Sequence, residues 1–298
     1  MSVLSVRAIA AGNRLGSYLA LAKPRVLSLI VFCAVIGMFL ATPGIVPMST
    51  LAAGTLGITL VAAAAAAFNC LIEHRRDALM ARTRSRPLPQ GAVGVAETLL
   101  VAGLAGGAGL LLLLDGTNAL TMWLTLATFV GYAFVYTVLL KPRTPQNIVI
   151  GGAAGAMPPV LGWAAVTGEA PIEAWLLFLI IFVWTPPHFW SLALYRTREY
   201  AEAGFPMLPV VRGRLYTQRS IVGYTLALAL VSLLPALVGM SGWIYLAAVV
   251  PLDVRFVMLA WRVLRSDSDA AARQTFRFSI TYLSLLFAAL LVDHYVAT

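Results

Sequence analysis

The sequence predicts an all-α polytopic membrane protein. Of its 298 residues, 60% are hydrophobic and 11% are charged, and the mean hydropathy is +0.88. The apolar residues gather in runs close to the ~20 residues that a helix needs to cross a bilayer. We therefore expect one transmembrane domain over residues 1–298, which includes a cytoplasmic amino-terminal tail at 1–20.

Nine apolar runs, bounded by Gly, Pro or charged residues, predict nine transmembrane helices. Small-residue pairs, Gly103 with Gly107 and Gly151 with Gly155, suggest close contacts between helices. In chain order the expected spans are 26–42, 51–70, 95–114, 119–139, 146–166, 172–194, 220–240, 242–262 and 275–295. A first charged loop follows the second span, Lys141 and Arg143 follow the fourth, and a second charged loop follows the sixth.

The basic residues indicate the orientation of the chain. If the amino terminus is cytoplasmic, every Lys and Arg except Arg255 falls on the inner side, and the outer connections near 43–50, 115–118, 167–173 and 240–242 contain none. We therefore expect cytoplasmic loops at about 71–94 and 195–219 and a carboxy terminus outside. The net charge of +9 then follows from membrane topology and does not indicate nucleic-acid binding.

Arg255 is the exception, in the inner half of the eighth expected span, two residues after Asp253. A charge inside the membrane is a candidate functional group. An arginine at this depth can also extend its guanidinium toward the cytoplasmic surface. Residues two apart on a helix do not face each other, so we favour this second interpretation over an ion pair with Asp253.

The first loop contains three oxygen-bearing side chains at four-residue spacing, Asn69, Glu73 and Asp77. If the second helix continues beyond the membrane, they line one face over ~12 Å. Carboxylate and amide oxygens suit Mg²⁺, which commonly bridges protein carboxylates and substrate phosphates. The arginines that follow are suited to hold phosphate oxygens: Arg82, Arg84 and Arg86.

Two simpler interpretations apply to this loop. Arginines in an inner loop mostly set topology. Acids contribute little to orientation, so Glu73 and Asp77 are not explained in this way, but ion pairing within or between helices would account for them.

The second loop repeats the combination of acids and arginines. Glu199 and Glu202 are three residues apart, and Arg196, Arg198, Arg212 and Arg214 surround them. Two such clusters on one membrane face would be able to clamp a diphosphate from both sides. Lys141, after the fourth span, would neutralise further charge, although a lone lysine at a helix end is more often an anchor.

His188 lies near the middle of the sixth span, directly after Pro186 and Pro187. Two adjacent prolines are expected to interrupt the regular helical hydrogen bonding. A neutral histidine there is either an axial ligand to a haem iron or a polar contact in the bundle, and we favour the packing or hydrogen-bonding role.

Six segments carry a family resemblance. They are "KPRV" at 23–26, Asn69 with acids at 73 and 77 leading into "LMARTRSRPLPQG", "YTVLLKPRTPQNIVIGGAAGAMPPVLGW" at 136–163, "WTPPHFWSLALYR" at 184–196, "YAEAGFPMLPVV" at 200–211 and "FRFSITYLSLLF" at 276–287. Together they resemble the UbiA-type intramembrane prenyltransferases. The PPHFW and AGFPMLP blocks are similar to the branch of that superfamily that farnesylates protohaem IX.

The resemblance implies a bundle of nine transmembrane helices around a central cavity in the bacterial cytoplasmic (inner) membrane. It implies Mg²⁺ as cofactor, farnesyl diphosphate as donor and haem b as acceptor, with haem O as the product. The implied partners are these two substrates, the lipid bilayer and a downstream haem A synthase, with no nucleic acid.

The resemblance also implies roles for residues of this chain. Asn69, Glu73 and Asp77 would form a first metal site and Glu199 a second, with Glu202 beside it. The other implied substrate contacts are Arg82, Arg86, Lys141 and Arg196 for the diphosphate, Lys23 and Arg25 for the haem propionates, and His188 in the bundle.

Two alternative functions stay open. A UbiA-type enzyme that prenylates an aromatic quinone precursor would use the same diphosphate machinery and differ in its acceptor. A haem or lipid transporter would distribute polar groups through both halves of the membrane, whereas this chain gathers them at one side.

Overall fold

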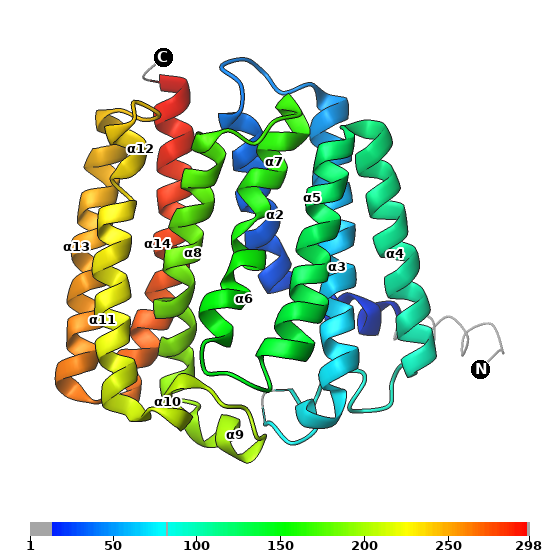
Figure 1. Ribbon diagram of the computed structural model, residues 1–298, viewed down its shortest axis with the longest axis vertical. Coiled ribbons are helices and arrows are strands. Elements are labelled where there is room, and N and C mark those ends of the chain that lie inside the picture. Colours follow the sequence, from blue (N-terminus) through cyan, green and yellow to red (C-terminus); the bar gives the residue numbers. More distant parts are fainter. Residues whose placement is uncertain (1–13, 82, 297–298) are drawn as a thin grey trace, which may run out of the picture.

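A computed structural model describes residues 14–81 and 83–296, and all regular structure in this part of the chain is helical (Figure 1). A short helix at Arg14–Leu21 comes first. The elements that follow are α2 (Pro24–Leu40), α3 (Met48–Asp77), α4 (Val95–Gly116), α5 (Ala119–Val130), the π-helix η1 (Gly131–Leu140), α6 (Asn147–Ala156), α7 (Pro158–Thr167), α8 (Ile172–Leu194), α9 (Thr197–Glu202), α10 (Leu208–Val211), α11 (Gly213–Val231), α12 (Leu234–Leu237), α13 (Trp243–Ser266) and α14 (Asp269–Val296).

The expected set of membrane spans is confirmed. Within the described residues, eight helical segments are long and apolar enough to cross a bilayer. The helix Arg14–Leu21 and α2 form a ninth span if this pair, bent by 55°, is counted as one. Residues 14–20, which were expected to lie in the tail, are thus helical, and Pro24 begins the new direction at the first turn of α2.

Several spans are composed of two helical pieces. The fourth continues from α5 into η1, the fifth is divided before Pro158, and the seventh is divided before α12. By contrast, α8 runs unbroken through Pro186 and Pro187, so the expected interruption does not end this helix. Neighbouring helices enclose the proline pair, which is buried, and packing of this kind makes helix-breaking residues tolerable inside a membrane.

The backbones of α2 and α7 approach each other so closely that only glycine fits at two of the contact points. A Cβ atom on Gly162 would lie 1.9 Å from the carbonyl oxygen of Ala34, and one on Gly37 would lie 2.3 Å from that of Pro159. Close approach of small residues is a common basis of helix association in membranes. It fixes α2, which follows Lys23, against the fifth span.

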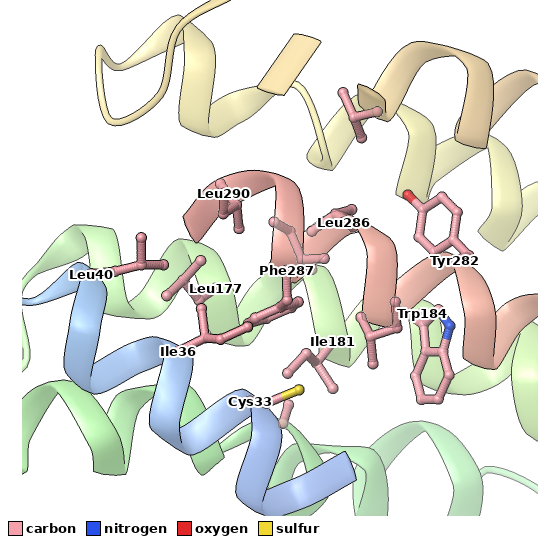
Figure 2. Packing of buried hydrophobic residues seen from close by; sticks show 14 of the residues in the cluster. Cys33, Ile36, Leu40, Leu177, Ile181, Trp184, Tyr282, Leu286, Phe287 and Leu290 are labelled. Atoms are coloured by element: carbon pink, nitrogen blue, oxygen red, sulfur yellow. The ribbon is translucent and has the colours of Figure 1, made fainter. Parts of the chain in front are cut away.

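The largest apolar cluster joins α2, α8 and α14 (Figure 2). Figure 2 shows Cys33, Ile36 and Leu40 of α2 facing side chains of α8 and α14, among them Leu177 and Phe287. Lipid tails are as apolar as these side chains, so the cluster stabilises the bundle mainly through close packing. Helices distant in the sequence are thereby held side by side.

The loops at 71–94 and 195–219 lie at the same end of the bundle, the lower end in Figure 1, which we call the loop end. A second apolar cluster joins them, since Met80 of the first loop packs with Tyr200, Phe205 and Met207 of the second. The short helices α9 and α10 belong to this second loop. The two charged segments predicted to hold the chemistry are therefore neighbours in space.

Candidate active site

The helix α3 presents Asn69, Glu73 and Asp77 on one face. It extends to Asp77, so the helical continuation on which the predicted alignment depended is present. All three residues are buried, with exposed fractions of 3%, 6% and 4%. A short row of polar side chains is therefore enclosed at the loop end of an apolar bundle.

Each of these side chains contacts a cationic side chain, which for Asn69 and Glu73 comes from another segment and for Asp77 from the same loop. Lys141 Nζ forms an ion pair with Glu73 Oε1, and Arg86 Nη1 donates to Asp77 Oδ2 at 2.6 Å. Lys23 Nζ donates to Asn69 Oδ1 at 2.5 Å. Because an unpaired charge is costly at such depth, these cations are what allows the carboxylates to be buried.

The π-helix η1 positions two of these contacts. Its end places Lys141, whose N–H donates to the carbonyl oxygen of Tyr136 at 2.9 Å. Thr137, one helical turn earlier, accepts a hydrogen bond from Asn69 Nδ2 at 3.3 Å through its hydroxyl. π-Helical segments are rare and frequently occur at functional sites. Here the segment faces α3 with a cation and a hydroxyl group.

Phe205 links the two loops through cation–π contacts. Its ring lies 4.8 Å from Lys141 Nζ and 4.9 Å from the guanidinium carbon of Arg76. Phe205 belongs to the second loop, and the two cations that its ring contacts lie near the Glu73 and Asp77 carboxylates. These contacts hold the second loop against the first. The composition of the sequence did not indicate Phe205, because the residue bears no charge, although it lies in the AGFPMLP block.

The second acidic residue, Glu199, lies on α9. Its Oε1 accepts from Arg196 Nη1 at 2.7 Å. Its other oxygen, Oε2, and Arg196 Nε are buried without a hydrogen-bond partner among the described residues. Buried polar atoms nearly always have partners in complete assemblies, so these two atoms are suited to a bound ligand, ion or water.

Glu202 and Arg198 lie apart from this pair. They form an ion pair with each other at 2.7 Å, and their side chains are 55% and 91% exposed. Exposed pairs of this type contribute little free energy. The structure thus places Glu199 inward and Glu202 on the surface of the same short helix. Arg82, another expected phosphate contact, is outside the described residues.

Of the two cations expected near the acceptor, only Lys23 reaches the site. It adopts a left-handed backbone conformation (φ 54°) between the first short helix and α2, and this turns its side chain to Asn69. Arg25, two residues on, is exposed. A non-glycine residue with positive φ is uncommon and often has a functional cause.

His188 is enclosed by aromatic rings. It stacks on Trp184 at 4.3 Å and on Phe276 at 4.7 Å between ring centroids, and its Nδ1 lies 2.6 Å from Ser279 Oγ. This arrangement agrees with the packing and hydrogen-bonding role that the sequence pattern favoured for His188. Sequence reasoning missed Phe276 and Ser279, which lie in the quoted segment 276–287 but are themselves uncharged.

Tyr195 connects this aromatic group to Arg196. Its ring contacts Phe276 edge to face, with centroids 6.3 Å apart, and lies 5.6 Å from the guanidinium carbon of Arg196. Burial raises the pKa of the Tyr195 phenol, although Arg196 and Arg273 oppose this change. The phenol is therefore neutral at physiological pH and is a hydrogen-bond donor beside the second cluster.

The donor set suits a hard divalent cation. No group of three His, Cys, Asp or Glu side chains with metal-binding geometry occurs among the described residues. Mg²⁺ does not require one, since it usually retains waters and binds through one or two carboxylates together with substrate phosphates. The oxygens of Glu73 and Asp77 and the unpartnered Oε2 of Glu199 fit this requirement.

Comparison with known proteins identifies the family. Residues 30–287 match the UbiA prenyltransferase family. The chain is 65% identical to the protoheme IX farnesyltransferase of Azoarcus sp. (strain BH72), over 99% of each chain. In fold it is similar to a digeranylgeranylglyceryl phosphate synthase, with a TM-score of 0.79, 18% identity and coverage of 94% and 98%.

A further similar fold is that of a UbiA homologue from Archaeoglobus fulgidus bound to GPP and Mg²⁺, with a TM-score of 0.67, 18% identity and coverage of 92% and 99%. The family match spans most of the chain, and the curated relative is similar over its full length. The chain therefore belongs to the UbiA prenyltransferase family.

Proposed function

We propose that this chain transfers the farnesyl group of farnesyl diphosphate to a vinyl group of haem b, which gives haem O. The observation that carries the proposal is the buried face of Asn69, Glu73 and Asp77, with its cations, at one end of an apolar bundle. The choice of substrates is supported by the 65% identity to a protoheme IX farnesyltransferase.

Metal binding is proposed for Asn69, Glu73, Asp77 and Glu199, whose oxygens fit Mg²⁺. When bound, Mg²⁺ neutralises negative charge that develops on a leaving diphosphate. In the chain itself, Lys141, Arg86 and Arg196 now contact these same acids. They are suited to turn toward diphosphate oxygens and to hold the group as its charge grows.

The proposed chemistry begins when the bond between the allylic carbon and the diphosphate oxygen breaks, and the electron pair leaves with the diphosphate. The haem vinyl group then bonds to the farnesyl carbon. Water adds to the adjacent carbon and releases a proton, which completes a hydroxyethylfarnesyl side chain. The apolar helices exclude water from the farnesyl cation before that step. We propose a central cavity among them for the farnesyl chain.

For the acceptor, we propose that Lys23 and Arg25 bind the haem propionates and that His188 contributes to the wall beside the porphyrin. The bond between Lys23 and Asn69 supports the first assignment, because it places a cation next to the metal-binding face. The stacking of His188 between Trp184 and Phe276 supports a polar contact in an aromatic wall over a ligand to iron.

We also propose that residues 1–298 act as one domain of the bacterial cytoplasmic membrane. The loop end and the amino terminus would face the cytoplasm and the carboxy terminus the outside, as the distribution of basic residues favours. Haem O released from the enzyme into this membrane would be the substrate of a haem A synthase. Reporter fusions at both termini test the orientation, which would be contradicted if the carboxy-terminal reporter were found in the cytoplasm.

The deciding experiment incubates the purified protein with haem b, farnesyl diphosphate and Mg²⁺. We expect a haem whose mass has increased by one farnesyl group and one hydroxyl group, together with released diphosphate. If farnesylated haem is absent and an aromatic acid is prenylated instead, the enzyme acts on a quinone precursor. If neither acceptor is used and diphosphate is not released, prenyl transfer is not its function.

A matched pair of variants tests the second metal site. Glu199→Gln is expected to lower kcat/KM by about 10- to 100-fold, as loss of a metal contact does. Glu202→Gln, on the exposed side of the same helix, is expected to stay within about twofold, because surface substitutions change free energies little. Equal effects of the two substitutions would show that Glu199 has no special role.

A further inference from the structure

A large groove lies between α13 and α14, outside the proposed active site. Its volume is about 1,090 Å³, and residues of these two helices alone line it. The two helices pack against each other, with α13 at the left edge of the bundle in Figure 1 and α14 further in, next to α8. The volume is at the upper end of the range for small-molecule sites, so the groove has room for a long ligand.

The lining combines an apolar channel with a basic end. Apolar side chains form most of the wall, for example Ala248, Leu252 and Ala289. The charged residues in the lining are three arginines, Arg255, Arg273 and Arg277, and the lining contains no acidic side chain. All three arginines are exposed. An apolar channel that ends in positive charge is complementary to an anionic amphiphile.

The three groove arginines have no acidic partner within the described part of the chain. Arg255, Arg273 and Arg277 form no ion pair with a carboxylate there, which is also true of other arginines at the loop end such as Arg219 and Arg265. Arg255 lies over the ring of Phe278 at 5.0 Å, and Arg273 lies over that of Tyr195 at 5.0 Å. Stacking orients a guanidinium group and leaves its N–H donors available.

Two of the arginines lie at a similar depth. Arg255 precedes the end of α13 at Ser266 by about 16 Å along the helix, and Arg277 follows the start of α14 at Asp269 by about 12 Å, at 1.5 Å per residue. Arg273 is closer to the loop end. The charges of these arginines therefore lie slightly inside the loop end of the bundle, next to the acyl chains of the leaflet at that end.

The groove faces away from the aromatic group around His188. On α14, Ser279 and Tyr282 are buried toward the bundle, while Arg277, Thr281 and Leu285 are exposed and line the groove. On α13, Phe256 is buried and Arg255 is exposed. A ligand in the groove would thus contact the surrounding bilayer and not the site proposed for haem.

We propose that this groove binds an anionic phospholipid of the leaflet at the loop end. Its phosphate would contact Arg255, Arg277 and Arg273, and an acyl chain would lie along the channel between α13 and α14. The proposal depends on insertion of the bundle in a membrane and is independent of the reaction that the enzyme catalyses.

The test uses the full-length protein in nanodiscs that contain phosphatidylcholine and phosphatidylglycerol, followed by mild delipidation and native mass spectrometry. We expect retained phosphatidylglycerol, and a loss of retention of about tenfold or more in the double variant Arg255→Gln with Arg277→Gln. The control is Arg219→Gln with Arg265→Gln, which removes the same charge from exposed arginines outside the groove and should retain the lipid.

A second variant separates the acyl channel from the basic end. Ala248→Trp places a bulky ring in the channel without a change in charge, and we expect it to reduce retention while size-exclusion profiles stay unchanged. Equal retention by all variants would overturn the proposal. Two other results would also overturn it. If the groove variants abolish binding of haem b, or if they dissociate a dimer, a different occupant of the groove is identified.

Discussion

At the scale of single residues, the site consists of acids that are already neutralised by cations. Glu73 pairs with Lys141 of a distant segment, and Asp77 pairs with Arg86 of its own loop. The spacing of Asn69, Glu73 and Asp77 predicted their common face. It did not predict the partner of Glu73, because a pairing across 68 residues depends on how α3 and η1 pack and not on any local pattern.

Asp77→Asn tests the first metal site at this scale. The substitution removes the charge and retains the shape, so we expect product formation to fall by about 100-fold or more with normal membrane insertion. Asp115→Asn, at an exposed acid on α4, is the matched control and should be near normal. Rates are followed by the mass of the haem product. Near-normal activity of Asp77→Asn would remove this residue from the site.

At the scale of elements, a buried polar cluster joins α11, α13 and α14. Asp253 accepts hydrogen bonds from Tyr282 at 2.6 Å and from Ser232, directly after α11, at 2.8 Å. Tyr245 donates to the carbonyl oxygen of Ser232 at 2.5 Å. Polar residues inside membranes often join helices in this way. The sequence placed Asp253 beside Arg255 in one span, and the structure directs the two to opposite sides.

Asp253→Ala leaves Tyr282 and Ser232 without their acceptor, so we expect destabilisation of about 1–2 kcal/mol. Thermal unfolding in detergent is the measurement. The double variant with Tyr282→Phe should lose less than the sum of the single changes, because both remove the same hydrogen bond. Additive losses would show that Asp253 and Tyr282 act independently.

The turn between α13 and α14 has an electrostatic contact that a pH series can test. Arg214 of α11 donates to Asp267 at 2.9 Å, and this hydrogen bond lowers the pKa of the Asp267 carboxyl below its ordinary value. A lowered pKa in the folded state means stability that is present above the unfolded pKa and lost as pH falls through the folded one.

We therefore expect the Tm difference between the parent protein and Asp267→Asn to be constant near neutral pH and to shrink below about pH 4. Asp115→Asn, whose carboxylate has no ion pair within the described residues, should show no such trend. A difference that grew on acidification would contradict the assignment of the contact to the ionised carboxylate.

Small-residue spacing shows where sequence patterns fail at this scale. A Cβ atom on Gly103, Gly107 or Gly155 would meet nothing within 4 Å, so these three are not contact points. One on Gly151 would lie 2.1 Å from Tyr136. The spacing alone does not determine which face of a helix meets a neighbour, and Gly37 and Gly162, which do mark a close crossing, have no glycine four residues away in the sequence.

At the scale of the whole molecule, the spans and the polarity of the bundle followed from hydropathy and charge, because a bilayer imposes both on any chain. The bend at Lys23 and the contact of the two loops through Phe205 did not follow. The first depends on one left-handed residue and the second on an uncharged ring. The assembled site is therefore a property of the folded bundle, which brings the ion pairs of both charged loops and Lys141 to one end.

This arrangement predicts that Mg²⁺ and the diphosphate bind with positive coupling. Without diphosphate, Mg²⁺ must displace Lys141, Arg86 and Arg196 from Glu73, Asp77 and Glu199 and leave those cations without partners. Diphosphate supplies new partners for them, so each ligand lowers the cost of binding the other. A ligand that binds only the folded state raises Tm in proportion to its binding free energy.

We therefore expect Mg²⁺ alone and a non-hydrolysable farnesyl diphosphate analogue alone to raise Tm by small amounts, and both together to raise it by clearly more than the sum. Removal of the metal with EDTA should return Tm to the value with the analogue alone. In Lys141→Met the excess should decrease, because one of the exchanged cations is gone. Strictly additive shifts in the parent protein would show that the metal and the diphosphate occupy independent sites, and the ion pairs at the loop end would then be structural only.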